Sequence, residues 1–587
     1  MRRKDAFLGL LLLALSSSGG CAVATPLFPK LVVVVVIDQM RSDYVDRFRA
    51  LFGSEGFARL VREGRKFEDA RFSYAATSTG PSHAVIGSGL YPDVSGIVGN
   101  AWFSREENRT AYCAEGPIDP GDPRRCARSG AQGSGGDAVR GVRNPCWFDG
   151  TSLAQRVKAR WPRARVVGVG LKDRSPILMV GSDADAAYWF DEKSRKRFVS
   201  SAAYSPDTDL LERFHTEVFP AFEGRLDRPG VALPGRSAWT YSLSRPPSEV
   251  CPEDIPSAHT PLFGLGASFP HRVESVAALA YSPLGDELLA RFTEEVVRAH
   301  GLGRNPSGQP DVLAVGFSAP DHVGHLYGPD SCEVADAMAR LDLVLERLLR
   351  FLEDVVPKRD LVVFLTSDHG VAPVPEVARS RGLSAGRIFL YDDGARTVGD
   401  LTAERRRLET ELAPLRGIAV SDKTPIERAI VRTFQEPSLY LNRDIVPPEE
   451  LPAWRGRVRE SLLGLEGVQS VYTSDEIVAG KAPETIRLAF REDRSGDLMI
   501  VAAENWVFDS KRSTLAANHG QPHEYDTRVP LLVWGGAVAP GSISDRVDVA
   551  RIAPTIASLL DLSRAGFSRP DPLPLGQEEK DHGRAGR

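Results

Sequence analysis

Six side chains of the types that bind metal ions are spread over most of the chain. They comprise three carboxylates and three imidazoles: Asp38, Asp321, His325, Asp368, His369 and His519. Such a set suffices for two metal ions with three protein ligands each and with coordination positions left open. Imidazole disfavours Mg²⁺ and Ca²⁺, and the absence of cysteine from the set favours an open catalytic site over a closed structural one. The residue types therefore predict a pair of zinc ions.

The positions of these residues support the prediction more strongly than their types do. Asp38, Asp321 and Asp368 each follow a short apolar run, and so do two cations, Lys172 and Arg174. In an open α/β sheet the carboxyl ends of the strands share one edge, and ligands bind there. Any one of these residues has an ordinary alternative as a turn residue, a satisfied core histidine or a solvated surface charge. Their convergence on one edge favours a site.

A hydroxyl-rich segment, YAATSTGPSH at residues 74–83, offers a nucleophile. It precedes small residues that can begin a helix, and a helix N-terminus binds phosphate through free N–H groups and the positive end of the helix dipole. Zinc would lower the pKa of a coordinated hydroxyl, as it lowers that of water from about 15.7 to about 7. The segment can also be an ordinary Ser/Thr turn. Its chemistry alone leaves four hydroxyls open: Thr77, Ser78, Thr79 and Ser82.

Buried strands of a parallel sheet account for the apolar runs. Runs without polar interruption, bounded by polar turns, are typical of strands covered on both faces. The runs occupy residues 31–37, 164–169, 312–317 and 361–365, with a fifth at 529–534. Between the third and fourth runs, apolar residues from Val334 to Leu352 recur at steps of three and four, which predicts an amphipathic helix capped by Asp330 with Glu333. Because strand, helix and strand in this order form a right-handed crossover, we expect an α/β fold with a doubly wound, mostly parallel sheet flanked by helices.

The composition of the chain changes outside this core. Arg- and Glu-rich helical stretches such as 401–415 indicate an inserted cap, and a region rich in Pro, Ser and aromatic residues indicates a second insertion. The Pro- and charge-rich C-terminus is typical of a disordered tail. The expected order is a signal peptide at 1–24, a first part of the core at 25–374 with an insertion at about 204–283, the cap at 375–484, a second part of the core at 485–562 and the tail at 563–587.

The N-terminus has the pattern of an export signal. Basic residues at 2–4 precede an apolar stretch at 6–15 and then small residues, and the apolar stretch is too short to span a bilayer. Cleavage after residues 22–24, and cleavage before Cys21 with a lipid attached to its sulfur, are the two alternatives. We therefore expect a periplasmic or secreted protein, with a lipid anchor through Cys21 in the second case.

Composition and charge limit the partners. The 587 residues are 42% hydrophobic and 26% charged, which excludes a wholly disordered or coiled-coil chain. Lys and Arg number 73 against 78 Asp and Glu, so the formal charge of −5 provides no basic field, and we expect no nucleic-acid partner. Besides Cys21, an odd number of cysteines remains for an oxidising compartment: Cys113, Cys126, Cys146, Cys251 and Cys332. Two disulfides and one free thiol is the simplest expectation, and the spacing does not give the pairing.

Several short motifs together resemble the alkaline phosphatase superfamily. They are DQM at 38–40, TSTGPSHA at 77–84, GIVGN at 96–100, KDR at 172–174, PDHVGHLYGP at 320–329, SDHG at 367–370 and NHG at 518–520. The likeness is to the secreted bacterial, phosphate-irrepressible branch with a threonine nucleophile, which is related to the nucleotide pyrophosphatases/phosphodiesterases. It runs from about residue 31 to residue 560. Each motif is short, but their order and spacing are jointly specific.

The resemblance implies a role for each residue of the site. The implied ligands of one zinc ion are Asp321, His325 and His519. Those of the other are Asp38, Asp368 and His369, with Thr79 at the same ion as the nucleophile. The groups implied to bind phosphoryl oxygens are Asn100, Lys172 and Arg174. Because residues two apart on extended backbone face the same side, Lys172 and Arg174 can reach the ligand together while Asp173 points away. Ser82 departs from the Gly that many relatives carry after the Pro.

These expectations describe an exported phosphomonoesterase with two zinc ions, acting on small phosphorylated substrates through a phospho-threonine intermediate. Lys172 and Arg174 favour monoesters, because a monoester dianion has one more non-bridging oxygen than a diester. A nucleotide pyrophosphatase/phosphodiesterase is the alternative on the same scaffold, and a non-catalytic zinc- and phosphate-binding envelope protein is a further one. A sulfatase lacks support, since no Cys/Ser-x-Pro-x-Arg segment lies at the nucleophile position. We expect a monomer.

Overall fold

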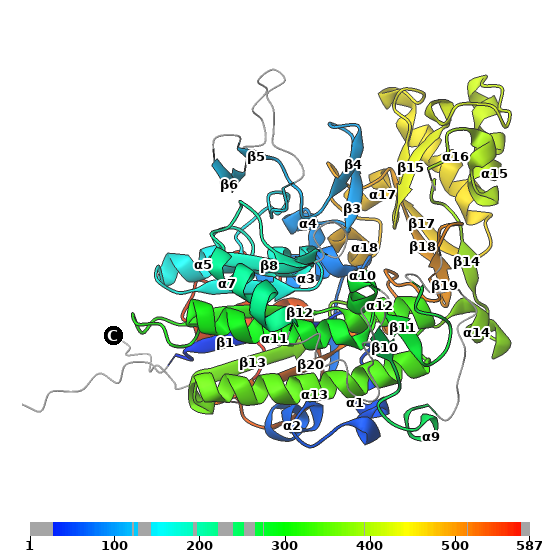
Figure 1. Cartoon of the computed structure of the whole chain (residues 1–587). Helices are drawn as coiled ribbons and strands as arrows, with labels where there is room; N and C mark the ends of the chain where they lie inside the picture. Colours follow the sequence, from blue (N-terminus) through cyan, green and yellow to red (C-terminus); the bar gives the residue numbers. More distant parts are fainter. Residues whose placement is uncertain are drawn as a thin grey trace, which may run out of the picture.

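Figure 1 shows the computed structural model of the chain, which describes residues 28–119, 122–126, 142–191, 197–220, 239–251, 264–273, 275–392, 394–513 and 515–576. The predicted signal peptide and the candidate lipid site at Cys21 lie outside the described residues, as does the end of the predicted tail. Among the residues that are described, no helix is both long enough and apolar enough to cross a membrane.

A nine-stranded mixed sheet forms the centre of the molecule. In spatial order its strands are β21 (Gly541–Asp548), β2 (Arg65–Arg71), β20 (Arg528–Gly535), β13 (Leu361–Thr366), β1 (Leu31–Ile37), β12 (Asp311–Phe317), β7 (Val166–Gly170), β8 (Ala186–Asp191) and β9 (Arg197–Val199). The five apolar runs are all strands of this sheet. β1 lies between β12 and β13 and runs parallel to both, β7 is parallel to β12, and β20 is antiparallel to β13. The predicted α/β fold with a mostly parallel sheet is confirmed.

Helices cover both faces of the sheet. Alternate side chains of a strand point to opposite faces, so one strand contributes to two hydrophobic cores. In β1, Val33 and Val35 belong to one hydrophobic core, while Val32 and Val34 belong to the other. The first core includes the two long helices drawn in green in Figure 1, α11 (Pro283–His300) and α13 (Cys332–Val355). The second includes α3 (Thr79–Ser88), α6 (Arg174–Val180) and α20 (Ile552–Leu559). Both faces are therefore buried, as the uninterrupted apolar runs predict.

Helix α13 confirms the predicted periodicity, although its cap differs. The recurring apolar positions from Val334 to Leu352 are buried. The N-cap is Ser331, whose hydroxyl accepts a hydrogen bond from the Val334 N–H at 3.2 Å. Asp330, the predicted cap, instead forms an ion pair with Arg381. The helix therefore begins one residue later than predicted, with a serine satisfying one of its free N–H groups.

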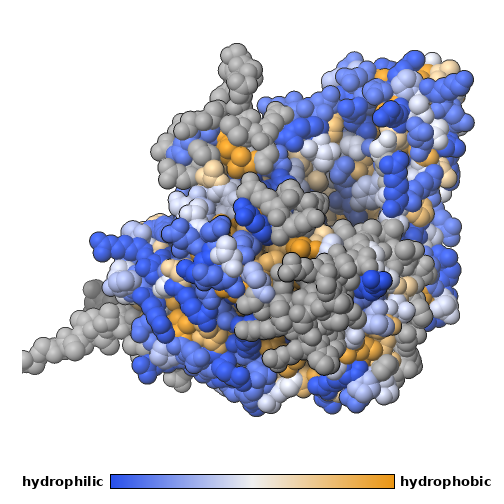
Figure 2. Space-filling view, in the orientation of Figure 1, coloured by the Kyte–Doolittle hydropathy of each residue, from blue (hydrophilic) through white to orange (hydrophobic). Residues whose placement is uncertain are grey.

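The cap is a separate layer with a hydrophobic core of its own. Its antiparallel sheet consists of β15 (Val431–Gln435), β16 (Ser438–Leu441), β18 (Leu498–Ala502) and β17 (Val468–Thr473). Since β18 follows residue 484, the cap extends beyond the boundary expected from the sequence. The change in composition indicated the charged helices of the cap, but it did not indicate the apolar strand β18, which completes the sheet. Figure 2 shows that the surface of the cap, at the upper right, is mainly hydrophilic.

Two disulfides tie peripheral segments to the core. One joins Cys126 to Cys146, and the other joins Cys251 to Cys332. In the described part of the chain, Cys113 is the free cysteine, and it is buried. The expectation of two disulfides and one free thiol is confirmed. The second disulfide attaches the insertion at 204–283 to the first turn of α13.

Residues 563–576 are packed, contrary to the predicted disorder. Phe567, Leu573 and Leu575 are buried in the core that contains α3. The Ser568 N–H donates to the carbonyl oxygen of Gly89, the C-cap of α3, at 2.9 Å. Burial of these apolar side chains completes the core beside α3 and stabilises the segment. The segment is therefore ordered despite its Pro- and charge-rich composition.

Candidate active site

Two clusters of three potential metal ligands lie at the carboxyl edge of the central sheet. One consists of Asp321, His325 and His519, and the other of Asp38, Asp368 and His369. Within each cluster, one ligand atom from each residue lies within 4.8 Å of those from the other two. The six residues singled out in the sequence thus meet in two groups, divided as the resemblance implied.

The sheet topology brings most of these residues together. Asp38 directly follows β1, and Asp368 and His369 follow its neighbour β13. On the other side of β1, β12 leads into helix α12, at Ala319–Tyr327. Asp321 and His325 lie four residues apart in α12 and therefore share one face of the helix.

Gln39, which the sequence did not indicate, links the two clusters. Its backbone N–H donates to Asp368 Oδ1 at 3.1 Å, and its side-chain Nε2 donates to Asp321 Oδ1 at 2.9 Å. Its φ of 65° lies in the left-handed region, which is uncommon for a residue other than glycine. Such conformations persist where the surroundings enforce them, and they cluster at functional sites. A glutamine in a turn carries no catalytic signature, so only its place next to Asp38 could have drawn attention to it.

The buried polar atoms of one cluster fit a cation. Asp38 Oδ1, Asp368 Oδ2 and His369 Nε2 are buried without a hydrogen-bond partner among the described residues. His369 Nε2 lies 3.5 Å from Asp38 Oδ1 and 3.4 Å from Asp368 Oδ2. Leaving such a group unsatisfied costs about 1–3 kcal/mol. One divalent cation can satisfy all three atoms, and a set of carboxylate oxygens with an imidazole nitrogen suits zinc.

Burial and nearby charges set the protonation states of the ligands. The pKa of Asp368 is raised well above its usual range by burial and by the charge of Asp38. Burial lowers the pKa of His369 to about 4. Burial, together with the neighbouring His369 and His325, holds the pKa of His519 well below its usual range. The rings of His369 and His519 are therefore neutral at pH 7, each with a lone pair available to a metal ion.

Backbone carbonyls orient the three imidazoles of the clusters. Nδ1 of each ring lies within hydrogen-bonding distance of a carbonyl oxygen: 2.8 Å from His325 to Ala517, 2.9 Å from His369 to Gly370, and 3.2 Å from His519 to Thr77. A ring that donates its Nδ1–H in this way presents Nε2 to a metal ion. The loop that carries His519 precedes β20 and is held over the site by this contact with the segment before α3.

The candidate hydroxyls differ in their access to the cavity and in their hydrogen-bond partners. Ser78 and Thr79 line the cavity above the clusters, and Thr79 is the first residue of α3. Arg174 Nη2 donates to Thr79 Oγ1 at 3.3 Å. Ser82 Oγ is instead paired with the buried Tyr74 hydroxyl at 2.7 Å. Thr79 thus combines a helix N-terminus, access to the cavity and a cationic partner.

Lys172 and Arg174 both line the same cavity, as predicted. They lie on a turn, however, and not on extended backbone. Arg174 begins α6, and Asp173 before it has helical dihedral angles, with φ −56° and ψ −46°. The argument from extended backbone was therefore wrong, even though both cations face the site. Lys172 Nζ lies 2.6 Å from Asp38 Oδ2 and also donates to Asp321, so it contacts one carboxylate of each cluster.

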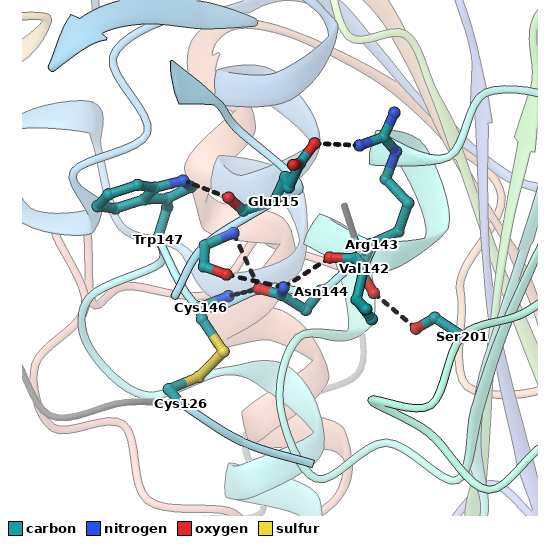
Figure 3. The surroundings of a disulfide bond; sticks show 9 residues. Glu115, Cys126, Val142, Arg143, Asn144, Cys146, Trp147 and Ser201 are labelled. Carbon is teal, nitrogen blue, oxygen red and sulfur yellow. Dashed lines mark hydrogen bonds and ion pairs between the residues drawn. A yellow bond between two sulfur atoms is a disulfide. The ribbon is translucent and has the colours of Figure 1, made fainter. Parts of the chain in front are cut away.

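A network behind Arg174 holds its guanidinium in place. Asp173 accepts hydrogen bonds from the Tyr112 hydroxyl and, at 2.6 Å, from Arg143 Nε. Arg174 Nη1 donates to the Tyr112 hydroxyl oxygen at 3.4 Å. The Arg143 guanidinium also lies over the Tyr112 ring, 4.7 Å from its centroid. Figure 3 shows that the same guanidinium pairs with Glu115. Tyr112 and Arg143 were not predicted, because they come close to Asp173 and Arg174 only in the folded chain.

The backbone that carries Arg143 is anchored by a buried amide and a disulfide, as Figure 3 shows. Asn144 Oδ1 accepts hydrogen bonds from the N–H groups of Cys146 at 2.8 Å and Gly116 at 3.0 Å. Cys146 is in turn bonded to Cys126. These contacts close the segment on itself and fix the position from which Arg143 reaches Asp173.

Asn100 is held against the nucleophile segment by its side-chain oxygen. Its Oδ1 accepts a hydrogen bond from the Gly80 N–H at 2.7 Å, and the residue lines the cavity. A Cβ at Gly80 would lie 2.9 Å from Cys113 Sγ and 3.2 Å from Asn100 Oδ1, so this close approach requires glycine. Since the oxygen is engaged, the amide NH₂ is the part of Asn100 that can donate to a ligand.

The cavity above the clusters has a volume of about 1060 Å³. Its floor contains Thr79, Asn100, Lys172, Arg174, Asp321, His325 and His519. Its walls come from the hairpin of β3 (Ala101–Ser104) and β4 (Arg109–Tyr112), from cap strand β15, and from the loop that begins at Asp509. Figure 1 shows the β3–β4 hairpin standing beside the cap. The cavity therefore lies between the core and the cap.

Glu436, in the turn after β15, is a wall residue that the sequence did not indicate. Its Oε1 accepts a hydrogen bond from Gln521 Nε2 at 2.8 Å, and its Oε2 accepts one from the Tyr391 hydroxyl at 3.1 Å. Burial raises the pKa of Glu436 to about 8. This carboxyl is therefore mostly neutral at pH 7.

The fold and the site define a class: a metal-dependent hydrolase of phosphate esters, built on an α/β sheet with two three-ligand clusters and a threonine at a helix N-terminus. The family model of type I phosphodiesterases / nucleotide pyrophosphatases matches residues 32–526, and the chain belongs to this family, within the alkaline phosphatase superfamily.

Individual relatives match over nearly the whole chain. The identity is 29% with alkaline phosphatase PhoV of Synechococcus elongatus, over 92% of this chain and 91% of that protein. It is 26% with a calcium-transporting ATPase of Myroides odoratus, over 91% of this chain and 92% of that protein. The crystal structure of wild-type alkaline phosphatase PafA superposes with a TM-score of 0.76 at 24% identity, covering 92% of this chain and 97% of that chain. This last likeness supports the fold.

We expect Tyr112→Phe to lower kcat/KM for phosphate esters about tenfold, which corresponds to about 1.4 kcal/mol. The reason is that the variant removes the hydroxyl shared by Asp173 and Arg174. The measurement is steady-state kinetics on an aryl phosphate. Tyr204→Phe is the matched control, because the buried Tyr204 hydroxyl has no hydrogen-bond partner among the described residues. Equal losses in the two variants would contradict a positioning role.

We expect Glu436→Gln to gain stability relative to wild type as the pH rises. Glutamate has an ordinary pKa of 4.5, whereas the pKa of folded Glu436 is about 8. Between these values the folded state keeps a proton that the unfolded state loses, so the contribution of Glu436 is complete below the lower pKa and is lost as the pH approaches the higher one. Thermal unfolding midpoints at a series of pH values would test this. Glu427→Gln, an exposed carboxylate on the same cavity, is the control, and a pH-independent difference for Glu436→Gln would refute the expectation.

Proposed function

We propose that the protein hydrolyses small phosphate monoesters at Thr79. The observation that carries the proposal is the place of Thr79: it begins α3, lines the same cavity as the cluster of Asp321, His325 and His519, and its hydroxyl is 3.3 Å from Arg174 Nη2. The relative named alkaline phosphatase PhoV, matched over most of both chains, supports the same reaction.

The two clusters suit two zinc ions. Asp321, His325 and His519 would hold one, and Asp38, Asp368 and His369 the other. When bound, zinc neutralises charge on the phosphoryl oxygens and lowers the pKa of a hydroxyl or water beside it. The chain prepares this site by keeping His369 and His519 neutral and by directing Nδ1 of each of the three imidazoles to a carbonyl oxygen, so that each Nε2 faces the cluster.

Thr79 is the proposed nucleophile. Its Oγ1 attacks phosphorus in line with the leaving oxygen, and the bond from phosphorus to that oxygen breaks as the bond to threonine forms. A water molecule then attacks the phospho-threonine, which releases inorganic phosphate and restores the hydroxyl. In both steps the chain mainly positions the phosphoryl group, whose oxygens are bound by the Arg174 guanidinium and the Asn100 amide.

The cations at the site favour monoesters. A monoester dianion has three non-bridging oxygens, and charge-assisted hydrogen bonds from guanidinium and ammonium groups are the strongest that a protein offers to them. Lys172 and Arg174 both face the cavity next to Thr79. Phosphodiester cleavage is the second candidate, favoured by the description of the matching family and by the room in the cavity for a second substituent.

We further propose that the protein is exported, with residues 1–24 as its signal and either a free or a Cys21-linked lipidated N-terminus. The two disulfides support an oxidising compartment. We keep the expectation of a monomer, and the charge balance of the sequence supports the expectation that there is no nucleic-acid partner.

Thr79→Ala should reduce phosphate release from aryl phosphates at least about a thousandfold, because the variant lacks the attacking atom. Ser78→Ala is the control, since Ser78 lines the cavity without being the nucleophile.

A chelator should abolish the activity of the wild type and zinc should restore it, with two zinc ions per chain by elemental analysis. Full activity in the metal-stripped protein, or in Thr79→Ala, would remove this mechanism. Phosphate binding without any turnover in the wild type would favour the non-catalytic alternative.

Arg174→Ala should lower kcat/KM for an aryl phosphate by about 10² to 10³, as for other groups that stabilise transition-state charge. The loss for the matching bis-aryl phosphate should be smaller, since a diester has one fewer charged oxygen to meet. Parallel kinetics on the two esters measure the difference. A wild-type preference for the diester, or equal losses on both substrates, would show that the site is not adapted to monoesters.

A further inference from the structure

The cavity is much larger than a phosphoryl group requires. Its volume of about 1060 Å³ reaches the upper end of the roughly 300–1,000 Å³ typical of pockets that enclose whole small-molecule ligands. Thr79 and the residues that would bind phosphoryl oxygens occupy its floor, so the outer part, between the β3–β4 hairpin and β15, is left for the alcohol that leaves. The side chains of this outer part are therefore the ones in a position to contact the leaving alcohol.

Arg432 of β15 lies in this outer part and is held in a defined position. Its Nη2 donates to Asn108 Oδ1 at 3.1 Å, and its guanidinium lies over the Phe103 ring, 5.5 Å from the centroid. Asn108 and Phe103 belong to the β3–β4 hairpin and its turn, so Arg432 connects the cap to the core across the cavity wall. Stacking on an aromatic ring orients the planar group and leaves its remaining N–H donors free for a ligand.

The charge of Arg432 is not neutralised locally. Among the residues that the structure describes, no carboxylate lies within ion-pairing distance of Arg432, and the same holds for Arg512 on the opposite loop. The third outer arginine, Arg109, is paired with Glu107 at 2.6 Å.

The acidic residues of the cavity walls are mostly engaged elsewhere. Asp392 pairs with Arg405 at 3.2 Å, and Asp509 pairs with Arg387 at 2.5 Å. The raised pKa of Glu436 keeps that carboxyl neutral below about pH 8. The one other wall carboxylate, among the described residues, is the exposed Glu427. The outer cavity therefore carries surplus positive charge.

We propose that the outer cavity is a leaving-group subsite for phosphate monoesters whose alcohol carries a second anionic group, and that Arg432 is the residue that recognises this group. The inference rests on the proposed phosphatase function and specifies its substrate class. A carboxylate or a second phosphate can both accept the paired N–H donors of a guanidinium, so the recognised feature is the anion next to an apolar ring or chain that can lie along Phe103.

The test compares substrates that differ only in this charge. 4-Carboxyphenyl phosphate and 4-carbamoylphenyl phosphate have nearly the same shape, and 4-(phosphonomethyl)phenyl phosphate extends the anion further from the ring. The quantity measured, at about pH 7, is the ratio of kcat/KM for each anionic substrate to that for the carbamoyl substrate. We expect Arg432→Gln to lower this ratio about fivefold for at least one anionic substrate, which corresponds to about 1 kcal/mol for a partly exposed ion pair.

Two controls separate recognition from other effects. Gln at position 432 can still donate to Asn108, so the contact between cap and hairpin is kept while the charge is lost. Arg428→Gln removes the same charge from an exposed side chain that does not line the cavity, and it should leave the ratio unchanged. Added salt should lower the wild-type ratio toward that of Arg432→Gln, because the interaction is electrostatic.

Several outcomes would overturn the subsite. These are an equal loss on charged and neutral substrates in Arg432→Gln, an equal shift of the ratio in Arg428→Gln, or an unchanged ratio for both anionic substrates. If the wild type hydrolyses none of the three esters, the proposed function itself fails. An active wild type with an unaffected ratio leaves the phosphatase in place and removes only the subsite.

Discussion

The structure depends on holding three carboxylates and three imidazoles within a few ångströms of one another in a buried place. Such a gathering is unfavourable by itself, since the carboxylates repel each other and several of their atoms have no hydrogen-bond partner. The protein sustains it with rigid supports: the ends of adjacent parallel strands, backbone carbonyls behind the imidazoles, the Gln39 backbone and the Lys172 ammonium. A pair of divalent cations would convert the same unfavourable arrangement into a tightly bound centre.

These supports explain which parts of the structure could be predicted from the sequence and which could not. Strands 31–37 and 361–365 were predictable because burial on both faces leaves an uninterrupted apolar run, and the ligands at their ends were predictable because the carboxyl ends of parallel strands must meet. Gln39 and Tyr112 were missed, since each acts through partners far away in the chain. The turn at Asp173 and the packed segment 563–576 were misjudged for a related reason: local composition does not show what a segment will pack against.

The proposed chemistry and the proposed selectivity belong to different parts of the molecule. The clusters, Thr79 and the support of Arg174 belong to the core, where the position of each group is fixed by the sheet or by the segment that the Cys126–Cys146 disulfide closes. The far wall of the cavity belongs to the cap, which has its own hydrophobic core and meets the hairpin through the side chain of Arg432. Changes in the cap can therefore alter which alcohol is accommodated without moving the groups that act on phosphorus.

The ligands of the two clusters come from almost the full length of the chain, from Asp38 to His519, and residues 563–576 then pack beside the helix that begins with Thr79. A ribosome-bound chain therefore has no complete centre until residue 519 has been synthesised. Fragments released early by stalled translation or by proteolysis lack His519 and the segment that supports α3. Such fragments would lack one residue of the ligand clusters however well their N-terminal parts fold, so a complete centre requires a chain that extends through His519.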